Sequence, residues 1–216
     1  MFFDAVDGKV GLPDKFINKQ ADIYRKIFRS RVLSPGEKGC YASQYSLWEK
    51  CIELDENIII LEDDILIEDL FVEMIAKLPM LHKKYDYIKI ESPPSKIGNV
   101  IYEEKCLIFS CFKNGASMGG YSLTPFAAKQ YIKHSQKWTC AVDNFIGENY
   151  KHKIKFYVLY PFVVSQREQF TSVDIFKSTI QLDEKSKVIA PFKLLRECHR
   201  FSRLSIWNCV NWIKER

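Results

Sequence analysis

With 216 residues, the chain is long enough to bury a hydrophobic core and is expected to form one domain, with or without an appendage. Its hydrophobic and charged fractions, 47% and 27%, are those of an ordinary globular protein, and the net charge is +5. No run of about 18 apolar residues occurs, which excludes a spanning helix, and the start lacks the pattern of a secretory signal. The seven cysteines have no Cys-x-x-Cys spacing, so we expect reduced core thiols in a cytoplasmic protein.

The first third of the chain contains one clear helix signal. Residues 2–8 form a short apolar stretch ending at a glycine, and residues 9–33 are weakly periodic, with a short helix expected around 18–25. In Ser34-Pro35-Gly36-Glu37, the serine and glutamate are spaced as a capping box, and the proline suits the first helical position. Apolar residues then recur at helical spacing, which predicts a helix to about Leu54.

Three acidic residues follow a short apolar run in the next segment. The run Ile58–Leu61 indicates a strand buried on both faces, and Glu62, Asp63 and Asp64 come directly after it. In open α/β sheets, ligands bind at the carboxyl ends of the strands. Three close anions are costly unless a cation or hydrogen bonds compensate them, and carboxylate oxygens suit Mg²⁺ or Mn²⁺. The alternative is a solvated acidic turn between a strand and a helix.

The middle of the chain alternates between strand and helix patterns. Helices are expected over 68–78, 125–134 and a short stretch near residue 143, and strands over 87–90, 106–112 and 154–160, with a loop or hairpin arm at 95–105. Small residues over 114–121 would let the backbone approach a neighbour or ligand closely. Residues 165–187 are polar and loop-like. The alternation predicts an α/β sandwich with a mixed, mostly parallel sheet flanked by helices.

The last 29 residues, 188–216, form a basic amphipathic segment that we separate from a domain spanning 1–187. Aromatic and aliphatic residues recur there at spacings of three and four, among an excess of lysine and arginine. Two interpretations stay open: a helix at the surface of an anionic membrane, or a helix that packs its apolar side on the domain.

Several segments occur in an order that identifies a family. They are Phe3-Asp4-Ala5-Val6-Asp7-Gly8, Ser34-x-Gly36-Glu37-x-Gly39-Cys40-x-x-Ser43-x-x-x-x-Trp48, Ile60-Leu61-Glu62-Asp63-Asp64, Gly120-Tyr121-x-Leu123, Val142-Asp143 and Pro161-x-Val163-x-x-Gln166. Over about residues 2 to 180, this set resembles glycosyltransferase family 25, which includes bacterial lipooligosaccharide galactosyltransferases and collagen galactosyltransferases. The resemblance implies a GT-A, Rossmann-like fold.

The resemblance also implies an activity. Members transfer a sugar, typically galactose from UDP-galactose, with inversion to a β-linkage, and here the acceptor would be a lipid-linked oligosaccharide of lipooligosaccharide or lipopolysaccharide. Glu62, Asp63 and Asp64 match the family's acidic motif, which binds a divalent metal, Mn²⁺ or Mg²⁺. A bound metal would neutralise the donor diphosphate as the sugar–phosphate bond breaks.

Three further site residues are predicted. An inverting transfer needs a base for the acceptor hydroxyl, and Asp143 is the first choice because it matches the family's Val-Asp; a helix N-cap is its alternative. Asp86 and Glu91 are weaker candidates for this base. Tyr121 and Gln166 are predicted to line the donor or acceptor site, with a core tyrosine and a surface glutamine as the alternatives.

A second functional interpretation comes from one departure. Family members normally have a strand and an arginine-containing helix ahead of the Phe3–Gly8 segment, and this sequence has neither. The alternative is therefore a degenerate, non-catalytic member of the same fold that binds carbohydrate or membrane. No basic stripe with interleaved aromatic residues lies near the acidic residues, so a nucleic-acid partner is not predicted. The expected location is the cytoplasm, at the inner face of the cytoplasmic membrane.

Overall fold

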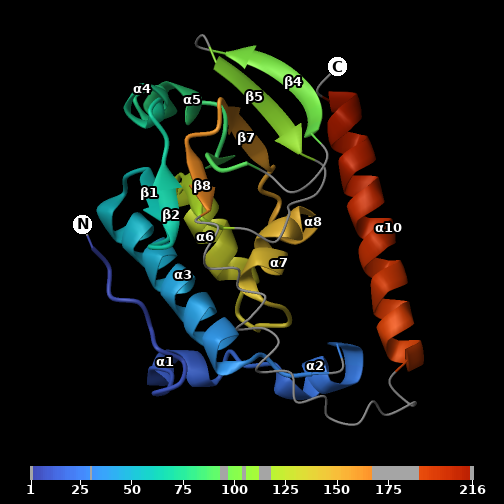
Figure 1. Cartoon of the computed structure of the whole chain (residues 1–216). Helices are drawn as coiled ribbons and strands as arrows, with labels where there is room; N and C mark the ends of the chain where they lie inside the picture. Colours follow the sequence, from blue (N-terminus) through green and yellow to red (C-terminus); the bar gives the residue numbers. More distant parts are fainter. Residues whose placement is uncertain are drawn as a thin grey trace. The chain divides into compact units, whose positions relative to one another are not determined.

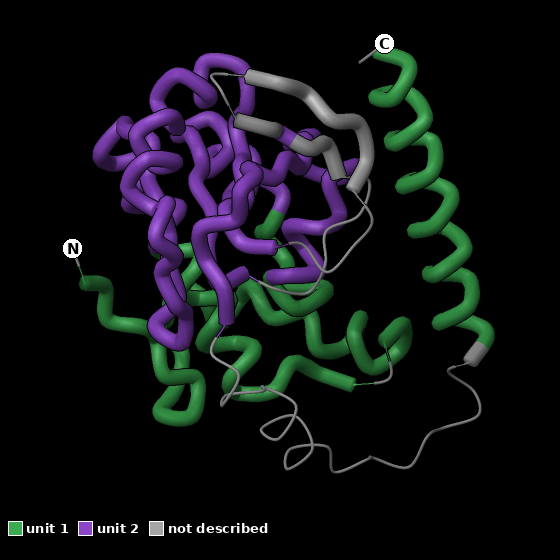
Figure 2. Tube along the Cα trace, turned by 45° about the horizontal axis from the view of Figure 1, so that its top comes forward, with its two compact units in different colours: residues 1–46, 135–142, 171–216 green, residues 47–134, 143–170 purple. Residues whose placement is uncertain are grey.

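The computed structural model describes residues 2–29, 31–92, 97–103, 106–111, 118–166 and 190–214. The chain consists of two compact units, coloured separately in Figure 2. Unit 1 comprises residues 1–46, 135–142 and 171–216, and unit 2 comprises residues 47–134 and 143–170. The predicted boundary between residues 187 and 188 lies outside the described residues.

Six described strands of unit 2 form one mixed sheet in the order β1-β6-β3-β7-β5-β4 (Figure 1). These strands are β1 Ile58–Leu61, β3 Tyr87–Lys89, β4 Ile97–Glu103, β5 Cys106–Cys111, β6 Gly120–Leu123 and β7 Tyr157–Tyr160. Among them, β3 and β7 pair in parallel, and the other four pairings are antiparallel. The α/β class and the mixed sheet are confirmed, but the prediction of a mostly parallel sheet is wrong.

Strand β1 explains part of this error. It lies at the edge of the sheet and pairs antiparallel with β6, and Ile60 is its one fully buried residue. The prediction that this strand is buried on both faces is therefore also wrong. An aliphatic run shows that a strand is apolar. It does not show whether the neighbouring strand is parallel or antiparallel, because that depends on the connections elsewhere in the chain.

The chain after the acidic residues is more divided than predicted. Strand β2, Ile65–Ile67, pairs antiparallel with β8, Val164–Gln166, in a separate two-stranded sheet. The single helix predicted over 68–78 is replaced by two short ones, α4 Phe71–Ile75 and α5 Leu78–Leu81. Pro79 lies in the first turn of α5, where a missing backbone N–H costs no helical hydrogen bond.

Apolar side chains cover both faces of the large sheet. On one face, strand residues pack with α4 and α5 in a cluster of Met74, Leu78, Leu81, Tyr85, Ile88, Ile90, Ile108, Tyr157, Leu159, Val163 and Val164. On the other face, rings from β3, β6 and the residue before β7 meet rings from α3 Pro35–Leu54, α6 Pro125–His134 and α7 Val142–Gly147. The cluster consists of Trp48, Tyr87, Tyr121, Tyr131, Phe145 and Phe156. Helix α8, Asn149–His152, joins this second cluster because His152 lies against Tyr131. Unit 2 is thus a sheet between two helical layers, as the sandwich prediction requires.

Unit 1 has its own aromatic core. The helices of this unit are α1 Asp14–Ile17, α2 Asp22–Arg29, the first part of α3, and α10 Ala190–Lys214. No helix in the described ranges is long and apolar enough to cross a membrane. Trp138 stacks on Tyr41 with ring centroids 4.4 Å apart and lies 5.5 Å from the ring of Phe16. The short helix predicted around 18–25 is replaced by α1 and α2.

Two glycines bring the amino-terminal segment against α3. A Cβ atom on Gly8 would lie 1.8 Å from the carbonyl oxygen of Pro35, and one on Gly39 would lie 2.5 Å from that of Val6. The Val6 N–H donates to Ser43 Oγ at 2.8 Å, which holds the segment in place. Two of the motif segments, far apart in the sequence, are therefore in direct backbone contact.

The predicted capping box of α3 is present. Glu37 N–H donates to Ser34 Oγ at 3.2 Å, and Ser34 N–H donates to Glu37 Oε2 at 2.8 Å. We expect Ser34→Ala to lower the free energy of unfolding by about 1 kcal/mol, because one orphan N–H of the helix loses its acceptor. Urea unfolding measures this, with Ser34→Thr as a control that keeps the hydroxyl. An alanine variant as stable as the wild type would contradict the role of the cap.

The cysteines only partly follow the prediction of core thiols. Cys51 and Cys140 are buried, but Cys40, Cys198 and Cys209 are exposed. The three exposed cysteines lie on the helices α3 and α10, among apolar residues of the sequence. Apolar neighbours in the sequence therefore did not show whether these thiols are buried.

Candidate active site

The acidic residues form a turn between β1 and β2 of unit 2. Glu62 and Asp64 are half-buried, and Asp63 is exposed. The Glu62 N–H donates to the carbonyl oxygen of Gly119 at 3.0 Å, which extends the β1–β6 pairing by one step. The turn is thus anchored at its first residue and is not simply a solvated loop.

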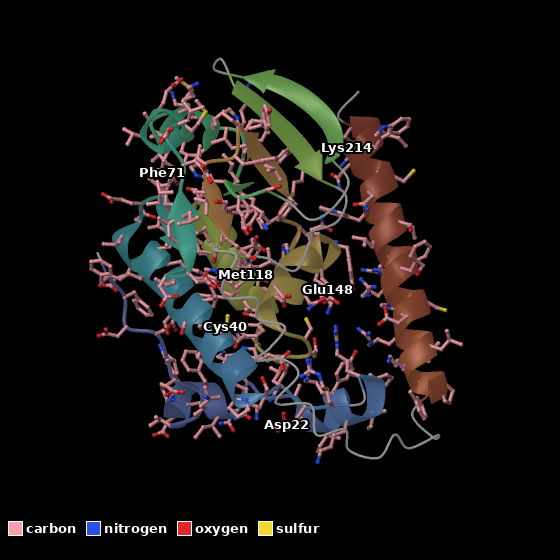
Figure 3. All side chains as sticks on the ribbon, viewed as in Figure 1. Asp22, Cys40, Phe71, Met118, Glu148 and Lys214 are labelled. Atoms are coloured by element: carbon pink, nitrogen blue, oxygen red, sulfur yellow. The ribbon has the colours of Figure 1, made fainter. Side chains whose placement is uncertain are left out.

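A buried ion pair lies beside this turn. Lys89 Nζ is 3.2 Å from Glu91 Oε2, and both side chains are almost entirely buried. Glu91 Oε2 also accepts a hydrogen bond from the Gly119 N–H at 3.0 Å. A Cβ atom on Gly119 would lie 3.3 Å from the Glu91 carboxyl carbon and 3.0 Å from Ile65 Cγ2. A larger side chain at position 119, next to Met118, which is labelled in Figure 3, would therefore crowd Ile65 and the Glu91 carboxyl beside the acidic turn.

The surroundings of Glu62 disfavour its negative charge. Burial, followed by the charges of Asp64, Glu91 and Asp63, raises the pKa of Glu62 to about 7, and Lys89 opposes this shift. Four carboxylates therefore act on one another at the end of β1. Such a group takes up a proton or a cation more readily than an isolated carboxylate does.

We expect the stability of the metal-free chain to fall as this carboxyl ionises. Because its folded-state pKa of about 7 exceeds the ordinary 4.5, the folded chain holds the Glu62 proton more tightly than the unfolded chain does. The resulting stabilisation is fully present below pH 4.5 and is lost as the pH rises through 7. Its upper limit is about 3 kcal/mol.

The variant Glu62→Gln tests this expectation in the presence of a chelator. Relative to the wild type, its free energy of unfolding should increase between about pH 5 and pH 8. Glu56→Gln, which changes an exposed carboxylate before β1, should show no such trend. If the free energies of unfolding of the wild type and Glu62→Gln changed with pH in parallel, the raised pKa of Glu62 would be contradicted.

The donor set of the acidic turn fits a divalent cation. Asp64 Oδ1 is buried and has no hydrogen-bond partner among the described residues. No group of three or more His, Cys, Asp or Glu side chains in the described part of the chain is already arranged around a metal position. Mg²⁺ commonly takes only one or two carboxylates and completes its shell with water and substrate phosphates. A preformed cage is therefore not required, and Asp64 with Glu62 or Asp63 would hold the ion.

The second sheet brings Gln166 close to the acidic turn. In the β2–β8 register, Gln166 is opposite Ile65, the residue that follows Asp64. Its side chain is exposed. Strand β8 was missed in sequence, where residues 165–187 were interpreted as a loop; those from 167 to 189 lie outside the described residues.

Tyr121 and Asp143 have different surroundings. The Tyr121 side chain is completely buried, and its hydroxyl accepts a hydrogen bond from Trp48 Nε1 at 3.1 Å, so the observed environment is that of a core tyrosine. Asp143 lies in the first turn of α7 and is half-buried. Its Oδ1 accepts a hydrogen bond from the Asn144 side chain at 3.0 Å.

The two weaker candidates for the base, Asp86 and Glu91, lie in different surroundings. Asp86 accepts a hydrogen bond from Thr124 Oγ1 and supports the start of α6, whereas Glu91 lies at the acidic turn. Lys89 was missed in the sequence analysis. A sequence signal for it existed, because Lys89 ends β3 and Glu91 follows two residues later, the spacing at which an extended backbone places side chains on the same face.

Comparison with known proteins agrees with the motif order. The profile described as Glycosyltransferase family 25 (LPS biosynthesis protein) matches residues 1–146. That range includes the amino-terminal segment, the acidic turn and Asp143, but not Gln166.

Several curated proteins are similar to parts of the chain. A glycosyltransferase 25 family member from Aedes aegypti is 25% identical over 159 residues, which are 70% of this chain and 20% of that protein. Procollagen galactosyltransferase 2 of Homo sapiens is 34% identical over 79 residues, 35% of this chain and 13% of that protein. The lipooligosaccharide biosynthesis protein lex-1 of Haemophilus influenzae is 35% identical over 66 residues, 30% of this chain and 22% of that protein.

The matched region spans about a fifth or less of most of these relatives. The relatives also include the inactive glycosyltransferase 25 family member 3 of Homo sapiens, 32% identical over 79 residues, 35% of this chain and 13% of that protein. The profile match nevertheless covers more than half of this chain, and its segments form the contacts described above. The chain belongs to glycosyltransferase family 25.

Proposed function

We propose that the chain is a metal-dependent, inverting hexosyltransferase of lipooligosaccharide or lipopolysaccharide biosynthesis. Its donor would be a UDP-sugar, UDP-galactose in the first instance, and its acceptor a lipid-linked oligosaccharide. The proposed location is the cytoplasm, at the inner face of the membrane. The observation that carries the proposal is the group of mutually repelling carboxylates at the end of β1, with one buried oxygen of Asp64 lacking a partner.

The proposed roles follow from the chemistry of each group. Asp64 with Glu62 or Asp63 would hold Mn²⁺ or Mg²⁺, and such an ion would supply positive charge for the departing diphosphate. Asp143 accepts the proton of the acceptor hydroxyl as that oxygen forms the new bond on the opposite side of the anomeric carbon. Gln166 lines the donor or acceptor site next to the acidic turn. Tyr121 contributes by fixing β6, because its own side chain is buried.

Lys89 and Glu91 hold the acidic turn in position under this proposal. Glu91 binds the Gly119 N–H, and the Gly119 carbonyl binds the Glu62 N–H, so the ion pair and the turn share one peptide segment. Lys89 also offsets part of the negative charge near Glu62.

Isothermal titration tests the donor and metal together. We expect the chain to bind UDP in the presence of Mn²⁺ and to bind it at least about tenfold more weakly with a chelator, because a divalent ion would offset the negative charges of both the carboxylates and the diphosphate. A substitution of the exposed Asp69, Asp69→Asn, is the matched control and should leave binding unchanged. A folded sample that ignores UDP at millimolar Mn²⁺ would refute the proposal.

A non-catalytic role is the second candidate. It is favoured by a relative that is named as inactive. Hydrolysis of UDP-galactose by the purified chain, lost in Asp143→Asn but with UDP binding retained, would exclude it.

A further inference from the structure

An arginine with an incomplete environment is buried in unit 1. Arg25 lies on α2 and is only 3% exposed, and its Nη1 atom donates to the carbonyl oxygen of Thr139 at 3.1 Å. Its Nε atom is also buried and has no hydrogen-bond partner among the described residues. A buried charge is stable only when an opposite charge and hydrogen bonds compensate it. Arg25 therefore lacks part of the compensation that a buried cation requires.

Hydrogen bonds within unit 1 fix the segment that Arg25 contacts. Next to Thr139, the Trp138 N–H donates to the carbonyl oxygen of Lys19 at 2.7 Å, and Trp138 forms a parallel bridge with Gln20. The segment is thus attached to the chain just before α2. All of these residues belong to unit 1. The contacts of Arg25 are therefore a property of unit 1 itself.

Two further arginines add positive charge near Arg25. Burial is the main cause that lowers the pKa of Arg25 to about 10, and the charges of Arg29 and Arg31 act in the same direction. Arg25 is therefore still a cation at neutral pH. Glu37 opposes the shift, but its two carboxylate oxygens already accept hydrogen bonds from Arg31, at 2.5 and 2.7 Å. The carboxylate that acts on Arg25 is thus already paired with another arginine.

Asp22 is the alternative partner for Arg25. It lies three residues earlier on α2, a spacing that allows an ion pair on a helix. The Oδ2 atom of Asp22, which is labelled in Figure 3, lies 3.6 Å from Lys38 Nζ. Its Oδ1 atom is buried and has no hydrogen-bond partner in the described structure. In the observed arrangement Asp22 pairs with Lys38 and leaves the Nε atom of Arg25 without an acceptor.

We propose that Arg25, Arg29 and Arg31 bind the phosphate group of a water-soluble ligand. Guanidinium groups bind phosphate oxygens through paired, charge-assisted N–H donors, and a phosphate would supply the negative charge that the burial of Arg25 requires. Arg31 is exposed and Arg29 is half-buried, so the ligand would approach from these two side chains. The acidic turn belongs to unit 2, which makes this a separate site, and the proposal does not depend on the transfer activity.

Thermal unfolding of the full chain with a chelator present tests this site. At about ten times its dissociation constant, inorganic phosphate should raise the melting temperature of the wild type by about 3 °C or more, relative to sodium chloride of equal ionic strength. Arg25→Met should lose this response. Without phosphate it should melt close to the wild-type temperature or higher, because an apolar side chain replaces an incompletely paired charge. The control Lys26→Met changes an exposed neighbour on α2 and should respond as the wild type does.

A second variant keeps the test valid if Arg25→Met does not fold. Arg29→Gln changes a half-buried side chain and should weaken phosphate binding at least about tenfold in isothermal titration, because one charge-assisted contact is lost. Glucose 6-phosphate, titrated in the same way, distinguishes the two sources of the phosphate group. Tighter binding of the ester than of the free ion assigns the site to a phosphorylated ligand, and the reverse assigns it to inorganic phosphate; either result supports the proposal. Circular dichroism shows whether each variant is folded.

Three outcomes would overturn the proposal. The first is a wild type that melts at the same temperature in phosphate and in chloride, while Asp22→Asn gains a response to phosphate, which would assign Arg25 to an ion pair with Asp22. The second is an unchanged phosphate response in folded Arg25→Met. The third is an Arg25→Met variant that melts many degrees lower without phosphate while Arg29→Gln binds phosphate as the wild type does, which would make Arg25 a structural residue.

Discussion

Replacing Asp64 with asparagine is expected to lower metal-dependent sugar transfer about 100-fold or more while the chain stays folded. The Asp64 Oδ1 atom is buried without a hydrogen-bond partner in the described structure, and the Asp64 charge helps to raise the pKa of Glu62. An amide of the same shape removes the charge that a cation needs and relieves the repulsion. The metal-free variant should therefore melt at the same temperature as the wild type or higher.

Two measurements separate a metal ligand from a structural residue. Mn²⁺ with UDP should raise the melting temperature of the wild type and should have little effect on Asp64→Asn. The exposed carboxylate Asp69, replaced by asparagine, is the control and should respond as the wild type does. A variant that melts many degrees lower without metal would mean that Asp64 holds the fold and does not bind an ion.

The largest loss of stability is expected from Trp48→Ala. Trp48 is completely buried, lies 5.0 Å from the ring of Tyr131 and 6.0 Å from that of Phe145, and donates to the Tyr121 hydroxyl. Truncation leaves a cavity between α3 and the sheet and removes this hydrogen bond. The free energy of unfolding should fall by about 3–5 kcal/mol in urea titrations.

The matched variant Trp48→Phe keeps a six-membered aromatic ring and removes the indole N–H together with the five-membered ring. Its loss should be clearly smaller, because Tyr121 keeps a packed neighbour. A loss below about 1 kcal/mol for Trp48→Ala would show that the aromatic cluster is not the core of unit 2. Equal losses for both variants would instead assign the stability to the hydrogen bond and the five-membered ring, which both variants lack.

Local features of the structure were determined by neighbouring residues and could be predicted. The capping box joins Ser34 and Glu37, three positions apart, and the helix that follows needs only its own apolar spacing. The acidic turn after β1 was recognisable because an aliphatic run stops at charged residues. Family membership was also accessible, because the order of short motifs survives in the linear chain.

The tertiary structure decided everything that depends on pairing between distant segments. Strand direction is one example, because an aliphatic run such as Ile58–Leu61 has the same pattern in parallel and antiparallel sheets. The positions of Gln166 beside the acidic turn and of Gly119 against Glu91 are others, since each follows from a strand register. The burial of Trp48 on α3 belongs here as well: spacing along a helix shows which residues share a side, but only the surrounding chain determines which side is covered.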